Sequence, residues 1–194
     1  MRTQIRIVAG LLRGRKLTCT VDPDLRPTPD RVREALFSIL GNAVPDRPFL
    51  DLFAGTGVIG LEALSREASF VEFVERDIRV AGEIMRHLHT FGMADRAKVH
   101  RADVYRWAER WQPPSEPVNV FLGPPFPDLT QRAGDLVQML ADLQQKTAPG
   151  SVLVLQSEKI WDPGKLVDSE HWEQRLYGRN RLSIWVKEPS SPAG

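Results

Sequence analysis

Short apolar runs alternate with amphipathic segments through the middle of the chain. Runs typical of buried strands occupy residues 49–53, 70–75, 98–100, 118–122 and 151–156, and helical periodicity follows the first four at 58–65, 77–91, 105–111 and 129–145. Alternation of strand and helix predicts a parallel sheet joined by right-handed crossovers. The expected fold class is therefore α/β, with a doubly wound, mostly parallel sheet of Rossmann-like type.

Both ends of the chain depart from this alternation. Near the N-terminus, apolar and polar residues alternate over 5–9, a Gly-bracketed turn follows, and 15–20 return, which predicts a β-hairpin. Near the C-terminus, 174–177 and 182–187 predict a second hairpin, whose antiparallel edge strands bring the sheet to seven strands. We expect residues 1–46 to form a hairpin-and-helix extension, 47–188 the main domain and 189–194 a tail.

An amphipathic helix is predicted between the first hairpin and the sheet. Thr28 stands just before Pro-Asp and suits the N-cap position, and apolar residues between 32 and 40 share one helical face. Arg31 and Arg33 are expected on the opposite face. A helix start that points Arg26 and Thr28 at a site and a purely structural packing helix both fit this pattern.

A Gly-rich turn follows the first buried strand and opens the next helix. Gly55, Gly57 and Gly60 fall at the spacing of the dinucleotide fingerprint, and Glu75 stands where the ribose-binding acid of that fingerprint belongs. Glycines allow a ligand to approach the backbone, and a helix N-terminus offers free N–H groups to an anion. The stretch therefore predicts a nucleotide-type site at the carboxyl end of a strand.

Asp51, just before the turn, helps to choose the ligand. A carboxylate there would repel a pyrophosphate but suits a ligand with an ammonium beside a carboxylate, as in S-adenosylmethionine. The ammonium would face Asp51, the carboxylate the loop amides and the ribose diol Glu75. The alternative is that Asp51 only caps the loop and the glycines only allow close packing; we favour the cofactor because all three features occur in order.

The composition of the 194 residues limits the setting. Apolar residues make up 42% and charged residues 26%, no apolar run reaches membrane-spanning length, and Cys19 is the only cysteine, so we expect a cytoplasmic protein without internal disulfides. The four histidines are scattered, with no Cys/His cluster at metal-ligand spacing. The formal net charge is only +1, yet five basic residues precede the first acid and could contact phosphates or form a solvated face: Arg2, Arg6, Arg13, Arg15 and Lys16.

A second stretch with chemistry follows the fourth buried strand. Gly123-Pro124-Pro125-Phe126 should reach the same sheet edge as the Gly-rich turn. Proline has no N–H, so carbonyls in such a turn are free to accept from a substrate amine, and Phe126 could stack on a flipped base. A surface turn with a core Phe is the structural alternative.

Several of these segments together resemble one family over nearly the whole chain. They are 5–16, the Arg26-Pro-Thr-x-Asp-Arg segment, Asp51-Leu-Phe-Ala-Gly-Thr-Gly, Leu61-Glu-Ala-Leu-Ser-Arg, Glu75 and the final hairpin. In order and content they are similar to the RsmD-type guanine-N2 methyltransferases of bacterial 16S ribosomal RNA. The resemblance implies a class I methyltransferase fold and S-adenosylmethionine as methyl donor. It also implies ribosomal RNA as partner, within a small ribosomal subunit or an assembly intermediate, and we expect the protein to act as a monomer.

The resemblance also implies roles for residues. The amino-acid end of the donor falls to Asp51, Gly55 and Gly57, the ribose to Glu75 and the adenine to Asp103 with Val104. Further candidate residues at the cofactor are Phe53, Ala54, Thr56 and Arg76. The candidate catalytic loop is Gly123, Pro124, Pro125 and Phe126, and the candidate RNA contacts are Arg6, Arg13, Arg15, Lys16, Arg26, Thr28 and Arg31. No metal is implied.

The sequence departs from the family at Gly123, where the family loop has Asp or Asn. In the family that side chain and the next carbonyl accept the two hydrogens of the substrate amine. Gly123 offers backbone only, the Pro124 carbonyl remains, and Asp128 is a candidate substitute acceptor. Two alternatives stay open: a slow or inactive relative that still binds cofactor and RNA, and a nicotinamide-dependent oxidoreductase that uses the literal glycine fingerprint.

Overall fold

The computed structural model of the chain describes residues 2–20 and 27–189. Its centre is a seven-stranded sheet in the order β5-β4-β3-β6-β7-β9-β8, in which β3 to β7 are parallel and β9 runs antiparallel to β7 and β8. The α/β prediction with a mostly parallel seven-stranded sheet is confirmed. The strands are β3 (Phe49–Leu52), β4 (Val71–Glu75), β5 (Ala97–Arg101), β6 (Asn119–Leu122), β7 (Val152–Glu158), β8 (Glu173–Tyr177) and β9 (Asn180–Val186).

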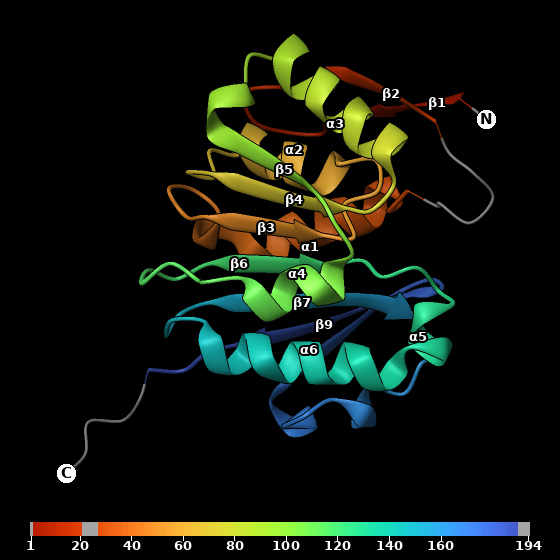
Figure 1. Ribbon diagram of the computed structural model, residues 1–194, viewed down its shortest axis with the longest axis vertical. Coiled ribbons are helices and arrows are strands. Elements are labelled where there is room, and N and C mark those ends of the chain that lie inside the picture. The colour runs from red at the N-terminus through yellow and green to blue at the C-terminus, as the bar shows by residue number, and fades with distance from the viewer. Residues whose placement is uncertain (1, 21–26, 190–194) are drawn as a thin grey trace.

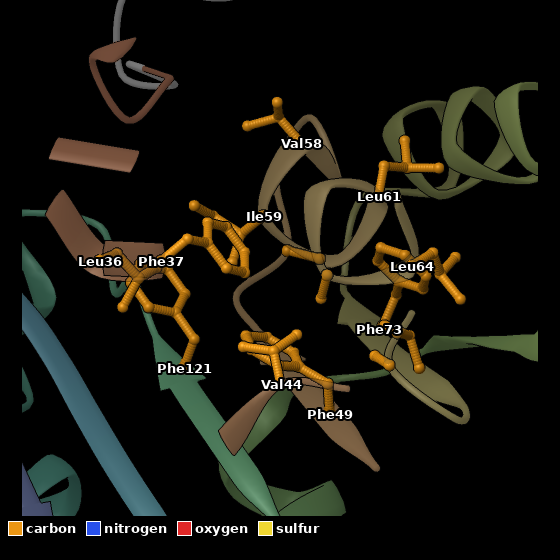
Figure 2. Close-up of a cluster of buried hydrophobic side chains, with 14 of the residues drawn as sticks. Leu36, Phe37, Val44, Phe49, Val58, Ile59, Leu61, Leu64, Phe73 and Phe121 are labelled. Carbon is orange, nitrogen blue, oxygen red and sulfur yellow. The ribbon is translucent and has the colours of Figure 1, made fainter. Parts of the chain in front are cut away.

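Helices cover both faces of this sheet (Figure 1). One face packs against α1 (Asp30–Leu40), α2 (Val58–Ser65) and α3 (Ile78–Thr90), and the other against α4 (Val104–Arg110), α5 (Asp128–Gln131) and α6 (Ala133–Lys146). Successive residues of each strand point to opposite faces, so each strand contributes to two cores. Figure 2 shows the first core, in which Leu36 and Phe37 of α1 meet Phe49 and Phe121 of the sheet.

The order of the strands reverses direction beside β3. The chain runs outward from β3 to β4 and β5 on one side, and from β6 to β7 on the other. In open α/β sheets, ligands bind outside the carboxyl ends of the strands at such a switch point. The loops that follow β3 and β6 therefore meet at the position where a site is expected.

The predicted N-terminal hairpin is present as β1 (Arg2–Arg6) and β2 (Lys16–Thr20). It packs beside α3 and is fastened to α2 by Glu62, whose side chain is 0% exposed and whose carboxylate accepts the backbone N–H groups of Val8 and Ala9 at 2.9 and 3.0 Å. The Ser65 hydroxyl also accepts the Leu12 N–H at 2.9 Å. The hairpin is thus bound to the helix that begins at the Gly-rich turn.

Four sequence predictions about local structure are corrected. Thr28 does not cap α1: Pro29 occupies the cap position, and the Thr28 hydroxyl donates instead to Gln156 at 2.9 Å. Arg33 does not face solvent: it is 1% exposed, because the hairpin covers that side of α1 and the Arg6 carbonyl accepts from its guanidinium at 2.9 Å.

The other two corrections concern the second half of the chain. The helix predicted over 129–145 is two helices, since Arg132 leaves helical geometry between α5 and α6. The C-terminal hairpin supplies only one edge strand, because β9 inserts between β7 and β8. No helix of the described residues is long and apolar enough to cross a membrane.

Candidate functional site

The Gly-rich turn after β3 has the geometry of an anion cradle. Gly55 and Gly57 have φ values of +52° and +72°, and a Cβ added to Gly57 would lie 2.8 Å from the Ile84 side chain. The N–H groups of Thr56 and Val58 donate to no acceptor among the described residues. They lie at the N-terminus of α2, where the helix dipole also favours negative charge. The turn can therefore hold a carboxylate or a phosphate.

Asp51 lies at the end of β3 and is 1% exposed. Its Oδ2 accepts the Gly60 N–H in the first turn of α2 at 2.9 Å. Burial raises the pKa of this carboxyl to about 8; the Gly60 N–H opposes the rise and the Glu75 carboxylate adds to it. The carboxyl thus fastens the loop, as the structural alternative foresaw, and no cation among the residues that the structure describes pairs with it.

Glu75, at the end of β4, braces the same turn. Its Oε2 accepts the Gly55 N–H at 2.9 Å and its Oε1 accepts the Asp77 N–H at 2.8 Å. Each oxygen keeps a second lone pair, which is the requirement for receiving two ribose hydroxyls. Arg76, the next residue, is exposed and makes none of the contacts described here.

A polar and aromatic cluster lies beyond β5. Asp103 caps α4 by accepting the Arg106 N–H at 3.2 Å, and its other oxygen pairs with Arg132 at 3.2 Å. The Arg132 guanidinium lies 3.7 Å from the centre of the Tyr105 ring. The Tyr105 hydroxyl in turn donates to Asp128 at 2.9 Å, and its burial and this bond raise the pKa of the phenol well above its ordinary value. This cluster joins α4 to the loop after β6.

Phe53 and Val104 lie beside this cluster. Phe53 has a φ of +61°, a left-handed conformation that costs a non-glycine residue about 1–2 kcal/mol. Its ring meets Tyr105 edge-on at 5.5 Å between centroids. Val104 is buried, as are Ala54 and Thr56. Phe53 thus lies between the Gly-rich turn, which it precedes in the chain, and Tyr105 of α4, the helix at whose start the family resemblance implies the adenine.

The Pro-Pro turn follows β6 directly. The Gly123 N–H donates to the Leu52 carbonyl at 3.2 Å, so the turn starts beside the end of β3. The Pro125 carbonyl is occupied by the Asp128 N–H at 2.9 Å, whereas those of Gly123 and Pro124 accept no hydrogen bond within the described residues. Phe126 is 38% exposed. The turn thus presents two free acceptors and an aromatic ring.

Asp128 is placed differently from the sequence hypothesis. It is 9% exposed at the start of α5, and the buried hydroxyl of Tyr105 donates to its carboxylate. Its carboxylate is therefore directed to α4 on the far side of the turn. On β7, one step beyond the pair Leu122 and Leu155, Gln156 is level with Gly123 in the strand register; its side chain accepts from Thr28 and donates to Asn180 at 3.1 Å.

Most of the predicted RNA contacts are exposed. Arg6 and Lys16 are partners across the hairpin and both are exposed. Arg13 stands in the exposed turn, and Arg31 is exposed on α1. Arg15 is partly engaged: its guanidinium donates to the Thr90 carbonyl at 3.4 Å and stacks over Phe91. Arg26 lies outside the described residues.

Cavities occur elsewhere in the part of the chain that the structure describes. One of about 370 Å³ lies between α4 and the β4–β5 edge and is lined by residues that include His100 and Trp107. Another, of about 290 Å³, opens at the amino ends of β3 and β6 beside Phe49 and Val118. Neither is lined by the Gly-rich turn or the Pro-Pro turn, so the cavities do not mark the site that the sequence and the sheet topology indicate.

Sequence reasoning missed Tyr105, Arg132 and Gln156. Tyr105 and Arg132 face each other only because α4 and α6 pack side by side. Gln156 is the first polar residue after the apolar run 152–155, and this was the one signal in the sequence that could have indicated a polar side chain at the site.

Comparison with known proteins agrees with this arrangement. Residues 5–186 match the family described as conserved hypothetical protein 95. The chain is 42% identical over 123 residues to ribosomal RNA small subunit methyltransferase D of Escherichia coli strain K12, covering 63% of this chain and 61% of that protein. It is 36% identical over 173 residues to the Haemophilus influenzae protein of the same name, covering 87% and 85%.

A solved structure gives the same result. The putative methyltransferase yhhF from Escherichia coli superposes with a TM-score of 0.77 at 30% identity, covering 97% of this chain and all of that one. The match to the first Escherichia coli relative spans only about three fifths of that protein, whereas the family match runs from β1 to β9. The chain therefore belongs to the conserved hypothetical protein 95 family, the RsmD-type class I methyltransferases.

Proposed function

We propose that this protein transfers a methyl group from S-adenosylmethionine to the exocyclic N2 amine of a guanine in 16S ribosomal RNA. The observation that carries the proposal is the meeting of two loops at the switch point of the sheet. The loop after β3 offers an anion cradle beside a buried carboxyl, and the loop after β6 offers free carbonyls and an exposed aromatic ring. Relatives named ribosomal RNA small subunit methyltransferase D support the substrate class.

The residues present fit the methyl donor. The free N–H groups of Thr56 and Val58 suit its carboxylate, and Asp51 supplies the negative charge that an ammonium requires. Glu75 has one unused lone pair on each oxygen for the ribose diol. We assign the adenine to the edge bordered by Phe53 and Val104. When bound, the donor supplies an electrophilic methyl group on a sulfonium.

The loop after β6 would position the acceptor amine. An amine on an aromatic ring is a weak nucleophile because its lone pair is delocalised into the ring. Hydrogen bonds from its two hydrogens to fixed acceptors turn the lone pair toward the methyl group, and a free carbonyl of the turn, that of Gly123 or Pro124, can supply one such acceptor. Phe126 would hold the flipped base by stacking, which contributes roughly 1–3 kcal/mol.

The buried Asp51 argues against a pyrophosphate-containing cofactor. A nicotinamide dinucleotide carries two negative charges on its pyrophosphate and has no ammonium to pair with this buried carboxyl. S-adenosylmethionine has an ammonium, which would stabilise the ionised form of Asp51. We therefore do not propose the oxidoreductase activity.

The proposed setting is the bacterial cytoplasm, with the protein acting as a monomer on a small ribosomal subunit or an assembly intermediate. The exposed Arg6 and Lys16 on the hairpin, together with Arg31 on α1, are the proposed contacts to phosphates. Because Glu62 and Ser65 bind the hairpin to α2, phosphate contacts there would fix the RNA relative to the donor site.

The test is methylation of defined substrates. Purified protein is incubated with labelled S-adenosylmethionine and either free 16S ribosomal RNA or small subunits from cells that lack the endogenous enzyme. Nuclease digestion and mass spectrometry should identify N2-methylguanosine at one position. Calorimetric binding of S-adenosylmethionine without methylation of either substrate would reduce the protein to the inactive relative, and tighter binding of a nicotinamide dinucleotide would refute the cofactor.

A further inference from the structure

The loop after β6 leaves one requirement of the reaction without a side chain. An aromatic amine is best aimed when both its hydrogens are bonded, and Gly123 supplies backbone only. Asp128 is directed to Tyr105 and is almost fully buried. A second acceptor with side-chain reach must come from a neighbouring strand or from α1.

The sheet register places Gln156 beside Gly123. Strands β6 and β7 are parallel, with Leu122 opposite Leu155, and one further step along each strand brings Gly123 level with Gln156. Neighbouring strands lie about 4.8 Å apart. The side chain of Gln156 is therefore the nearest side chain on β7 to the position that Gly123 leaves empty.

The two positions also share a face of the sheet. Phe121 and Val154, two residues earlier on each strand, both point into the core shown in Figure 2. Because strand side chains alternate, Gly123 and Gln156 are directed to that same face. A Cβ added at Gly123 would lie 3.1 Å from the Phe121 ring and, its two chain neighbours aside, within 4 Å of no other described side chain. The rest of the space that a side chain at 123 would fill is therefore open to a substrate group lying between Gly123 and Gln156.

The amide of Gln156 is held in place from both sides. Its Oε1 accepts the Thr28 hydroxyl at 2.9 Å, and its Nε2 donates to Asn180 Oδ1 at 3.1 Å. An amide oxygen has two lone pairs, so Oε1 keeps one acceptor position free. Thr28 belongs to the segment before α1, which therefore crosses the carboxyl end of β7 and fixes the side chain there.

We propose that Gln156 is an acceptor for the substrate amine, taking one amine hydrogen on Oε1 while a carbonyl of the Pro-Pro turn takes the other. The inference rests on the methyltransferase function proposed above. In the reaction the amine nitrogen forms a bond to the methyl carbon as the carbon–sulfur bond breaks, and that electron pair stays on sulfur. The nitrogen then loses a proton to water, because a neutral amide accepts a hydrogen bond but does not keep a proton.

The test compares Gln156→Met with a matched change elsewhere in the sheet. Methionine has a similar length but does not replace the amide acceptor. Gln174→Met is the control, since Gln174 also accepts a side-chain hydroxyl, from Ser183 at 2.7 Å, but lies on the far edge strand β8. We expect Gln156→Met to lower kcat for RNA methylation at least tenfold, with unchanged affinity for S-adenosylmethionine and unchanged kcat in the control.

A second variant separates chemistry from folding. Gly123→Asn restores an amide on the same face, and adding it to Gln156→Met should recover most of the lost kcat. If Gln156→Met does not fold, Gln156→Glu keeps an acceptor and should remain active. A folded Gln156→Met with full kcat, or a folded Gln156→Glu that binds S-adenosylmethionine but is inactive, would overturn the acceptor role. A wild type that methylates no RNA would instead overturn the proposed function itself.

Discussion

Asp51 offers the sharpest test of how the donor site works, through the substitution Asp51→Asn. Burial raises the pKa of this carboxyl from an ordinary 3.8 to about 8. In the unfolded chain Asp51 ionises near its ordinary pKa, whereas in the folded protein it stays protonated up to about pH 8. The free energy of unfolding is therefore unaffected by this carboxyl below about pH 4 and falls progressively as the pH rises from about 4 to about 8.

The size of the effect follows from the shift. Each pH unit between the two pKa values is worth 1.36 kcal/mol, so at pH 7 the buried acid lowers the free energy of unfolding by an amount on the order of 4 kcal/mol. Asparagine keeps the acceptor for the Gly60 N–H and does not ionise. In the absence of S-adenosylmethionine, Asp51→Asn should therefore be more stable than the wild type at pH 7–8 and about equally stable at pH 4.

The same substitution should damage binding. Loss of a charged partner for the ammonium should weaken S-adenosylmethionine by about 1.5–3 kcal/mol. The affinity of the wild type for S-adenosylmethionine should peak near pH 8. Below that pH, Asp51 is protonated and binding of the ammonium requires the proton to leave; above it, the α-amino group of the ligand, whose pKa is about 7.7–8.0, loses its charge. The affinity of Asp51→Asn for S-adenosylmethionine should not rise as the pH is raised toward 8.

The assays are urea unfolding at pH 4 and pH 8 and calorimetry across pH 6–9, with the exposed Asp95→Asn as the control. Equal stability of Asp51→Asn and wild type at pH 8 would refute the burial argument. An unchanged affinity would show that Asp51 does not meet the ammonium and serves only to fasten the loop.

Three further predictions follow from the braces and charges around the site. Glu75→Ala should weaken S-adenosylmethionine by about 1.5–3 kcal/mol in calorimetry, because both the ribose acceptor and the brace of the Gly-rich turn are lost; an unchanged affinity would remove Glu75 from the site. Replacing Arg6 and Lys16 together by Gln should weaken RNA binding and flatten its dependence on log salt by about 1.8, without effect on donor affinity; an unaltered slope would make the hairpin a solvated face. Glu62→Gln should lower the free energy of unfolding by about 2–4 kcal/mol in urea, because the buried carboxylate accepts four hydrogen bonds, from Val8, Ala9 and Arg66, and an amide cannot accept all of them; a loss as small as that of the exposed Glu34→Gln would contradict this.

Much of the architecture was accessible from local sequence pattern. The order of strands and helices follows from apolar periodicity, because a residue's preference for strand or helix depends mainly on neighbours a few positions away. The Gly-rich turn was equally readable: the glycines at 55 and 57 adopt positive φ, which few other residues tolerate. Capping at Asp77 and termination of α1 at Gly41 are local in the same sense.

Tertiary structure decided what lies beside what. Arg33 is buried because the hairpin, from an earlier part of the chain, closes over α1. Thr28 does not cap α1 because its hydroxyl donates to Gln156 of β7. Asp128 is directed to α4 because its carboxylate accepts the hydroxyl of Tyr105. Each of these contacts joins segments that are remote in sequence, and no local periodicity records the register that brings Gln156 level with Gly123. The loop proposed to hold the methyl donor depends on backbone conformation and could therefore be predicted from the sequence, whereas the side chains proposed to act on the acceptor are brought together only by the assembled sheet.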